Sequence, residues 1–136
     1  MTKTRKIGLI INTGSYERVA YALSFASICA ATGMEVHVLF SYGAIPRLVK
    51  GNTDFLGDET PEWIRDTLKK GLERGHIQKI SDLIRDFMRF GGKIYACVGA
   101  MALHNVVKDD LLDGVKVASI TSFLESVEDA NFLLYV

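Results

Sequence analysis

Short apolar runs separated by helical segments are the feature of this sequence that most restricts its fold. In three of these runs, residues 6–11, 35–41 and 93–97, apolar residues follow one another instead of occupying every second position. This pattern is typical of strands that are covered on both faces. Residues 115–119 and 131–136 form two further runs. Strands that alternate with helices pair in parallel, so the sequence predicts an α/β fold, a three-layer α/β/α sandwich with a mainly parallel five-stranded sheet.

Helix-end signals place helices between the predicted strands. Ser15 is a suitable N-cap for the first helix, and Gly33 is a suitable stop for it. Thr60 and Pro61 form a typical helix start, with a capping hydroxyl followed by proline at the first helical position. Thr121 or Ser122 can cap the last helix. The expected helices span residues 16–32, 61–75, 80–90, 99–106 and 122–128, with a helical turn within 42–48. Because no linker or internal repeat interrupts the pattern, we expect a single domain over residues 1–136.

The charge balance and the cysteine count exclude several classes of protein. Sixteen basic and sixteen acidic residues cancel and are mixed along the chain, so neither nucleic acid nor an anionic membrane is an expected partner. No apolar run approaches the length of a membrane span, and the basic start of the chain lacks the cleavage site of a signal peptide. The two cysteines, 68 residues apart, suit neither a disulfide framework nor a metal cluster. We therefore expect a cytoplasmic protein with free thiols.

Cys97 is the candidate for chemistry because of its position in the predicted sheet. It ends the strand over residues 93–97, and ligands collect at the carboxyl ends of parallel strands. The helix expected at 99–106 would bring free amides next to the sulfur, and these amides and the helix dipole favour a thiolate. The position also fits a thiol that only fills space in the core. Cys29, in the middle of a helix on an apolar face, is expected to be such a core residue.

A series of short motifs surrounds Cys97. Its members are Ala96-Cys97 at the strand end, Met101 in the next helix, Asp110-Leu111 and Asp113-Gly114-Val115 in the turn, and Phe123-Leu124 in the last helix. The Ala-rich first helix and the strand that precedes Tyr42-Gly43 add to the pattern. Together, over nearly the whole chain, these features resemble the DsrE/DsrF-like family.

The resemblance implies a DsrEFH-like fold with flavodoxin-like architecture and a homo-oligomer, often a trimer or hexamer. It implies a sulfur carrier or sulfurtransferase that accepts sulfane sulfur on Cys97, as a persulfide or thiosulfonate, and passes it on. Sulfur-donor and sulfur-acceptor proteins are the expected partners, and no cofactor is expected. The residues expected to line the site are Gly99, Ala100, Met101, His104, Tyr42 and Gly43. At Ala100 this chain departs from many relatives, which carry there a hydroxyl able to donate a hydrogen bond to the sulfur.

The histidines suggest no metal site. His104 follows Cys97 by seven residues, about 10 Å along a helix, which is too far for a hydrogen bond but close enough to line the same side of a site. His37 is expected in the interior or at an interface, and His76 at a helix end. Because no histidine has ligand spacing to a cysteine or carboxylate, we predict no metal.

Two other functions stay open from the sequence alone. Residues 12–15 faintly resemble a flavodoxin-type phosphate loop, and amides at a helix N-terminus hold anions. A non-catalytic module that binds a nucleotide or flavin at Thr13 to Tyr16 is therefore one alternative. The other is an assembly subunit whose cysteine is vestigial.

Large apolar residues lie in or beside the polar loop over residues 50–60. Phe55, Leu56 and Trp63 can cover a neighbouring subunit, form a lid over the Cys97 site, or pack within the monomer. The sequence does not separate these three roles.

Overall fold

The five strands form one fully parallel sheet. A computed structural model describes residues 4–136. The strands are β1 (Lys6–Ile11), β2 (Glu35–Phe40), β3 (Lys93–Cys97), β4 (Lys116–Ala118) and β5 (Phe132–Tyr135). Their order in the sheet is β4-β3-β2-β1-β5, and every pairing is parallel. The predicted fold class is therefore confirmed, with strands from both ends of the chain in the same sheet.

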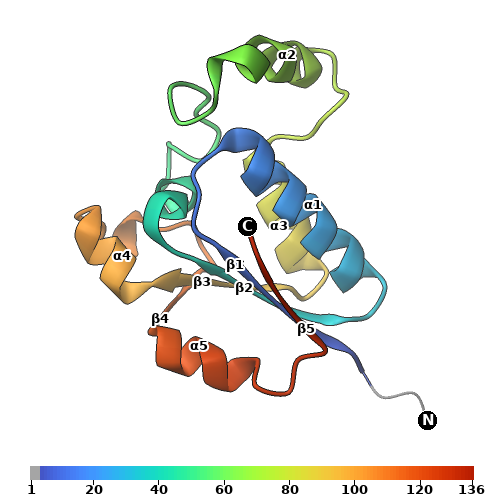
Figure 1. The fold of residues 1–136 in the computed structure, drawn as a ribbon, viewed down its shortest axis with the longest axis vertical. Coiled ribbons are helices and arrows are strands. Elements are labelled where there is room, and N and C mark those ends of the chain that lie inside the picture. Colours follow the sequence, from blue (N-terminus) through green and yellow to red (C-terminus); the bar gives the residue numbers. More distant parts are fainter. Residues whose placement is uncertain (1–3) are drawn as a thin grey trace.

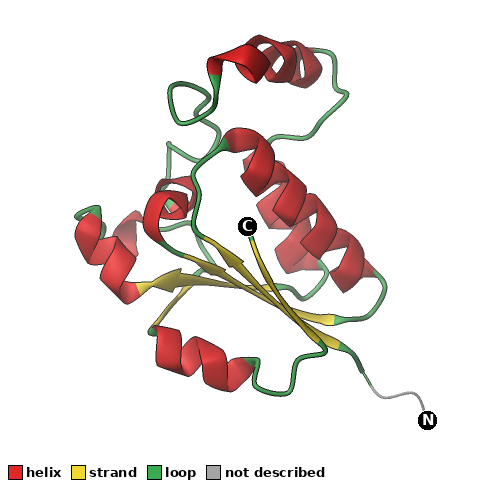
Figure 2. Cartoon of the chain, in the orientation of Figure 1, coloured by secondary structure: helices red, strands yellow, loops and turns green. Residues whose placement is uncertain are grey.

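Helices lie on both faces of this sheet (Figures 1 and 2). The α-helices are α1 (Tyr16–Ala31), α2 (Glu62–Glu73), α3 (Ile80–Arg89), α4 (Val98–Leu103) and α5 (Ile120–Ser126), and the 3-10 helices are η1 (Tyr42–Leu48) and η2 (Lys108–Asp110). Helices α1 and α3 pack side by side on one face, whereas α5 lies on the other. Helix α2 stands away from the sheet and has no buried residue. Within residues 4–136, no helix is long and apolar enough to cross a membrane.

The core lies mainly between the sheet and the α1–α3 layer. Ile7, Leu9 and Ile11 of β1 are buried, as are Val36, Val38 and Phe40 of β2. Helix α1 turns its small apolar side chains toward the sheet. Its buried residues include Val19, Ala22, Leu23, Ala26 and Ala30. Because small side chains permit close packing, the Ala-rich sequence of α1 suits a helix that lies directly on the strands.

Ser15 is the N-cap residue of α1, as predicted, whereas the caps predicted at Thr60 and at Thr121 or Ser122 are wrong. Thr60 does not cap the helix that follows it: its hydroxyl accepts a hydrogen bond from the Tyr16 amide at 2.8 Å, so it caps α1 instead. The Ser15 hydroxyl makes no capping hydrogen bond. The cap of α5 is Ser119, which accepts from the Ser122 amide at 3.1 Å. The free amides at the start of a helix donate to whichever hydroxyl oxygen lies within hydrogen-bond distance, even one that is distant in the sequence.

The side chain of Arg47, in η1, ties the 50–60 loop to the turn before α1. It is 3% exposed, and its Nε and Nη2 donate to the Gly14 carbonyl at 3.1 and 2.8 Å. Its Nη1 donates to the carbonyls of Thr53 and Phe55. Glu59 supplies the opposite charge at 3.5 Å, while burial lowers the pKa of Arg47. The loop is thus fixed over the N-terminus of α1.

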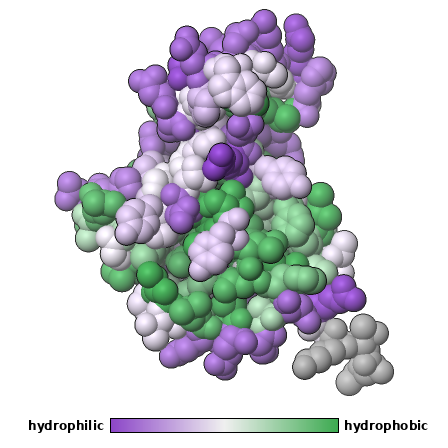
Figure 3. All heavy atoms as spheres, viewed as in Figure 1, coloured by the Kyte–Doolittle hydropathy of each residue, from purple (hydrophilic) through white to green (hydrophobic). Residues whose placement is uncertain are grey.

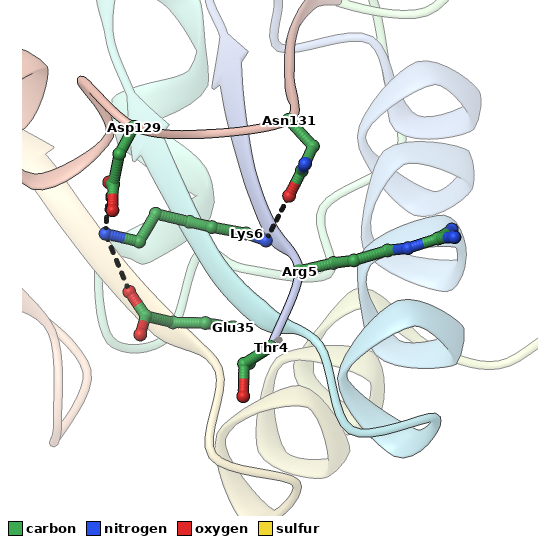
Figure 4. Close-up of a pocket in the computed structure, with 6 residues that line it drawn as sticks. All are labelled: Thr4, Arg5, Lys6, Glu35, Asp129 and Asn131. Carbon is green, nitrogen blue, oxygen red and sulfur yellow. Dashed lines mark hydrogen bonds and ion pairs between the residues drawn. The ribbon is translucent and has the colours of Figure 1, made fainter. Parts of the chain in front are cut away.

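At the amino end of the sheet, a polar network joins β1, β2 and β3. Figure 4 shows the part of it around Lys6. Lys6 Nζ contacts the carboxylates of Asp129 at 2.6 Å and Glu35 at 3.3 Å. His37 contacts Glu35 through Nε2 at 2.6 Å and the Tyr95 hydroxyl through Nδ1 at 2.7 Å. A carboxylate only accepts, so Nε2 carries the proton and, in the neutral ring, Nδ1 accepts from the tyrosine. His37 is thus a satisfied interior group, as expected.

Replacing Arg47 should destabilise the fold far more than replacing a surface arginine. Arg47→Met leaves one buried and two partly buried carbonyls without their donors, and we expect the free energy of unfolding to fall by about 2–4 kcal/mol. Arg85→Met is the matched control, because Arg85 is 63% exposed and, among residues 4–136, pairs only with Asp82. Its cost should stay below about 1 kcal/mol in the same denaturant titration. Equal costs for the two variants would contradict the role given to Arg47.

Glu35→Gln should reduce the dependence of stability on acid pH. The hydrogen bond from His37 is the main cause that holds the pKa of Glu35 below its ordinary value of 4.5. A carboxyl group with a lowered pKa stabilises the fold above that value, and the contribution disappears as the pH falls through the folded-state pKa. The variant should be less stable than wild type at pH 7, by less than about 1 kcal/mol because the side chain is partly exposed, and this difference should vanish as the pH falls below the folded-state pKa of Glu35. Denaturant titrations of both proteins between neutral and acid pH measure the two free energies of unfolding. A difference between them that does not change with pH would refute the prediction.

Candidate functional site

Cys97 lies at the carboxyl edge of the sheet. It is the last residue of β3 and immediately precedes α4. The residue is 6% exposed, and the thiol is free. Its side chain makes no hydrogen bond to the first amides of α4, a helix of only six residues. Among the described residues, no amide of α4 therefore donates to the reduced sulfur.

A cavity of about 340 Å³ opens beside the thiol. Its lining residues come from the end of β2, from the end of β3 with α4, and from the start of α5: Ser41, Tyr42, Cys97, Gly99, Ala100, Leu103 and Ile120. A side chain added at Gly99 would meet no other atom within 4 Å, so this position borders open space. A reactant can therefore approach the sulfur on the Gly99 side.

Ser41 and Cys97 occupy corresponding positions on neighbouring strands. The last paired residues of β2 and β3 are Phe40 and Ala96, and Ser41 and Cys97 each come one residue later. The Ser41 amide donates to the Ile11 carbonyl at 2.9 Å, which keeps Ser41 in line with its strand. Because side chains at matching positions of parallel strands point to the same face, the hydroxyl and the thiol share the cavity.

Tyr42 is held in a backbone conformation that is costly for a residue other than glycine. Its φ is +43°, in the left-handed region. His104 Nε2 donates to the Tyr42 carbonyl at 2.7 Å, which links the helix after Cys97 to the segment after β2. His104 thus holds the backbone of Tyr42, which lines the cavity, although His104 itself does not line it.

The structure brings only part of the predicted site together. Tyr42, Gly99 and Ala100 line the cavity with Cys97, whereas Met101, His104 and Gly43 do not. Met101 is 5% exposed and belongs to the core, because the short helix turns it inward. Gly43 lies against the α1 turn instead, where a side-chain carbon on Gly14 would come within 2.5 Å of the Gly43 carbonyl oxygen.

Sequence reasoning missed Ser41, Leu103 and Ile120. A signal for Ser41 was present, because it ends the apolar run over residues 35–41 and a neighbouring strand end belongs to the same edge. Ile120 gave no such signal: it reaches the cavity only because α5 starts next to the end of β4.

The site is electrically neutral. Among the described residues that line the cavity, none carries a charge. Within residues 4–136, no group of three His, Cys, Asp or Glu side chains is placed to hold a metal ion. The second cysteine lies elsewhere, half-buried in α1, where burial raises the pKa of the Cys29 thiol. Of the two cysteines, Cys97 is the one that opens to a cavity.

The turn before α1 offers little room for a phosphate. The Tyr16 amide is occupied by the Thr60 hydroxyl, and the Gly14 carbonyl by Arg47. Thr13 turns its hydroxyl back to the Ser15 amide at 3.1 Å. These protein contacts weigh against a nucleotide or flavin at Thr13 to Tyr16.

A larger cavity, of about 550 Å³, lies at the opposite end of the sheet (Figure 4). Lys6, Glu35 and Asp129, which help to line it, are bound to one another in the network described above. Asn131 accepts a hydrogen bond from the Lys6 amide at 2.9 Å, and Arg5 points away from the network. No thiol lines this cavity, so the Cys97 cavity remains the candidate site.

Solved structures share this fold at low sequence identity. The YchN protein from E. coli superposes with a TM-score of 0.66 at 10% identity, covering 98% of this chain and 100% of its own. The protein of unknown function MTH1491 from Methanobacterium thermoautotrophicum gives 0.61 at 16% identity, covering 96% and 98%. The protein of unknown function BT1422 from Bacteroides thetaiotaomicron gives 0.61 at 12%, covering 96% and 94%. At these identities the likeness extends to the fold alone.

A family model gives the more specific result. No curated protein matches this sequence. The model of the DsrE/DsrF-like family, in contrast, matches residues 5–135, which is nearly the whole chain. With the parallel sheet, the shared fold and this match, the chain belongs to the DsrE/DsrF-like family.

Proposed function

We propose that this protein is a sulfur carrier or sulfurtransferase that accepts sulfane sulfur on Cys97 and passes it to another thiol. The observation that carries the proposal is the position of Cys97 at the carboxyl edge of the sheet, beside a cavity that borders open space. Membership of the DsrE/DsrF-like family, which suggests a role in sulfur relay, supports it. The proposal assigns Tyr42, Gly99 and Ala100 to the walls of the site.

The proposed reaction needs a nucleophilic sulfur and no cofactor. In the loading step, the Cys97 thiolate attacks the outer sulfur of a persulfide R–S–SH, the bond between the two donor sulfurs breaks, and R–S⁻ leaves. Cys97 then carries the outer sulfur as Cys97–S–SH. With thiosulfate as donor, sulfite leaves and Cys97 again carries a persulfide. With tetrathionate, thiosulfate leaves and Cys97 carries the thiosulfonate Cys97–S–S–SO₃⁻. A thiolate on the acceptor attacks the carried sulfur in the same way, and Cys97 leaves as the thiolate.

The proposal includes donor and acceptor proteins and a reducing, cytoplasmic setting. A reducing compartment keeps thiols available for exchange. Gly99 lies at the open side of the cavity, so a partner can present its sulfur from there. Leu103, which lines the cavity, and Val98, which precedes Gly99 in the chain, are 64% and 51% exposed, and such apolar side chains suit contact with another protein surface.

A homo-oligomer, of trimeric or hexameric size, is part of the proposal. Strand β5 has a neighbour on one side only, and Phe132, Leu133, Leu134 and Tyr135 are 54%, 41%, 39% and 70% exposed. Figure 3 shows hydrophobic side chains gathered where β5 crosses the molecule, between α1 and α5, whereas the surface of α2 is mainly hydrophilic. An exposed apolar edge strand invites pairing, so a second copy of this chain is the proposed cover for β5.

Loading of Cys97 tests the central step. The reduced protein is incubated with polysulfide, thiosulfate or tetrathionate, and the intact and peptide masses are measured. We expect an adduct of sulfane sulfur on the Cys97 peptide, because this thiol alone opens to the candidate site. Cys97→Ser should lose the adduct completely.

Cys29→Ser is the matched control for this experiment. Cys29 is half-buried on α1 and does not line the cavity, so this variant should load like the wild type. The absence of an adduct with all three donors, or an adduct that persists in Cys97→Ser, would rule out the proposed function.

Charges placed on β5 should break the oligomer. The double variant Phe132→Glu/Leu134→Glu should elute as a monomer of 15.0 kDa in size-exclusion chromatography with light scattering, whereas the wild type should give three or six times that mass. Trp63→Glu is the comparison, because Trp63 is 78% exposed on the distant α2. Dissociation by Trp63→Glu but not by the double variant would move the interface to α2, and a monomeric wild type would refute the oligomer.

A further inference from the structure

The Ser41 hydroxyl is a polar group that the mechanism above does not use. Ser41 is 7% exposed and lines the same cavity as Cys97. Within residues 4–136, its side chain makes no hydrogen bond, although its amide and carbonyl are both engaged, with Ile11 and Ala44. Unlike the fully buried hydroxyl of Ser15, the hydroxyl of Ser41 keeps contact with the open cavity, so a group that enters there can accept its hydrogen bond. Its position in the cavity suggests that its partner is the bound reactant.

The reduced thiol is not that partner. No hydrogen bond joins the Ser41 hydroxyl to the Cys97 sulfur in the described chain, even though the two residues stand at matching positions of β2 and β3. When Cys97 becomes a persulfide, the outer sulfur lies about 2 Å beyond the first one. That second sulfur enters the cavity that both side chains line. The outer sulfur is a hydrogen-bond acceptor, and it lies in the cavity that the Ser41 hydroxyl faces.

The cavity suits a persulfide better than a thiosulfonate. A thiosulfonate adduct ends in a sulfonate group. Basic side chains bind such an anion through charge-assisted hydrogen bonds, which are stronger than hydrogen bonds between neutral groups. None of the described lining residues is basic. A persulfide presents a single sulfur, and one hydroxyl donor is enough to stabilise its charge.

From these observations we infer that Ser41 donates a hydrogen bond to the outer sulfur of a persulfide carried on Cys97. The inference rests on the proposed function of Cys97 and adds a second residue to its site. It also accounts for Ala100: the donor that this position lacks comes from the end of β2, across the cavity. No covalent bond to Ser41 forms or breaks, so the bonds made and broken in the loading and transfer steps are those described for Cys97 above.

The test measures how strongly Cys97 holds the outer sulfur. The protein is equilibrated with a neutral alkyl persulfide and its parent thiol at a fixed ratio, and intact mass gives the loaded-to-unloaded ratio. Ser41→Ala should lower this ratio about tenfold, the typical effect of losing a hydrogen bond to a charged acceptor. Ser41→Thr keeps the hydroxyl and should retain most of the loading. The rate at which iodoacetamide alkylates the unloaded Cys97 should stay within about twofold in both variants, because the hydroxyl acts only on the outer sulfur.

Ser15→Ala is the matched control. Ser15 is also 7% exposed and its hydroxyl is also unpartnered, but it stands at the start of α1 and does not line the cavity. This variant should load like the wild type. If wild type and Ser41→Ala load equally, the inference on Ser41 is wrong while the proposed function stands. If Ser41→Ala and Ser41→Thr lose loading equally, the hydroxyl is not the cause and the inference also fails. If wild type does not load at all, the proposed function itself has failed.

Discussion

The parallel pairing of β2 with β3 is the constraint on which the site depends. Their register ends at Phe40 and Ala96, so Ser41 and Cys97 leave the sheet together, at one edge and on one face. In a parallel pair the carboxyl ends of both strands meet at the same edge, which brings residues 56 positions apart into one cavity. A register shift of one residue would turn the hydroxyl or the thiol to the opposite face.

The segments above this edge are fixed by polar contacts rather than by core packing alone. Arg47 binds the carbonyls of Gly14, Thr53 and Phe55, and so fastens the 50–60 loop over the start of α1. The loop thereby supplies Thr60 as the cap of α1. On the cavity side, His104 holds the strained backbone of Tyr42. The site thus has walls held by hydrogen bonds, with its opening beside Gly99.

The sequence predicted what depends on local pattern and on chain direction. Continuous apolar runs identified the strands and the parallel sheet, and Cys97 followed from the end of one run. Contacts between residues distant in the sequence were predictable only in part. Thr60 caps α1, which begins 44 residues earlier in the chain, and Ile120 lines the cavity from the start of α5. Met101 was misplaced because the face of a six-residue helix that points inward cannot be read from so few positions.

Transfer of labelled sulfur out of Cys97 tests the account most directly. The protein is loaded with sulfur-isotope-labelled persulfide, freed of donor, and mixed with a thiol acceptor. The account predicts that the label leaves the Cys97 peptide and appears on the acceptor as sulfane sulfur, and that Cys97→Ser carries none. Label that stays on Cys97, or that is found on Cys29 instead, would contradict a carrier role for Cys97.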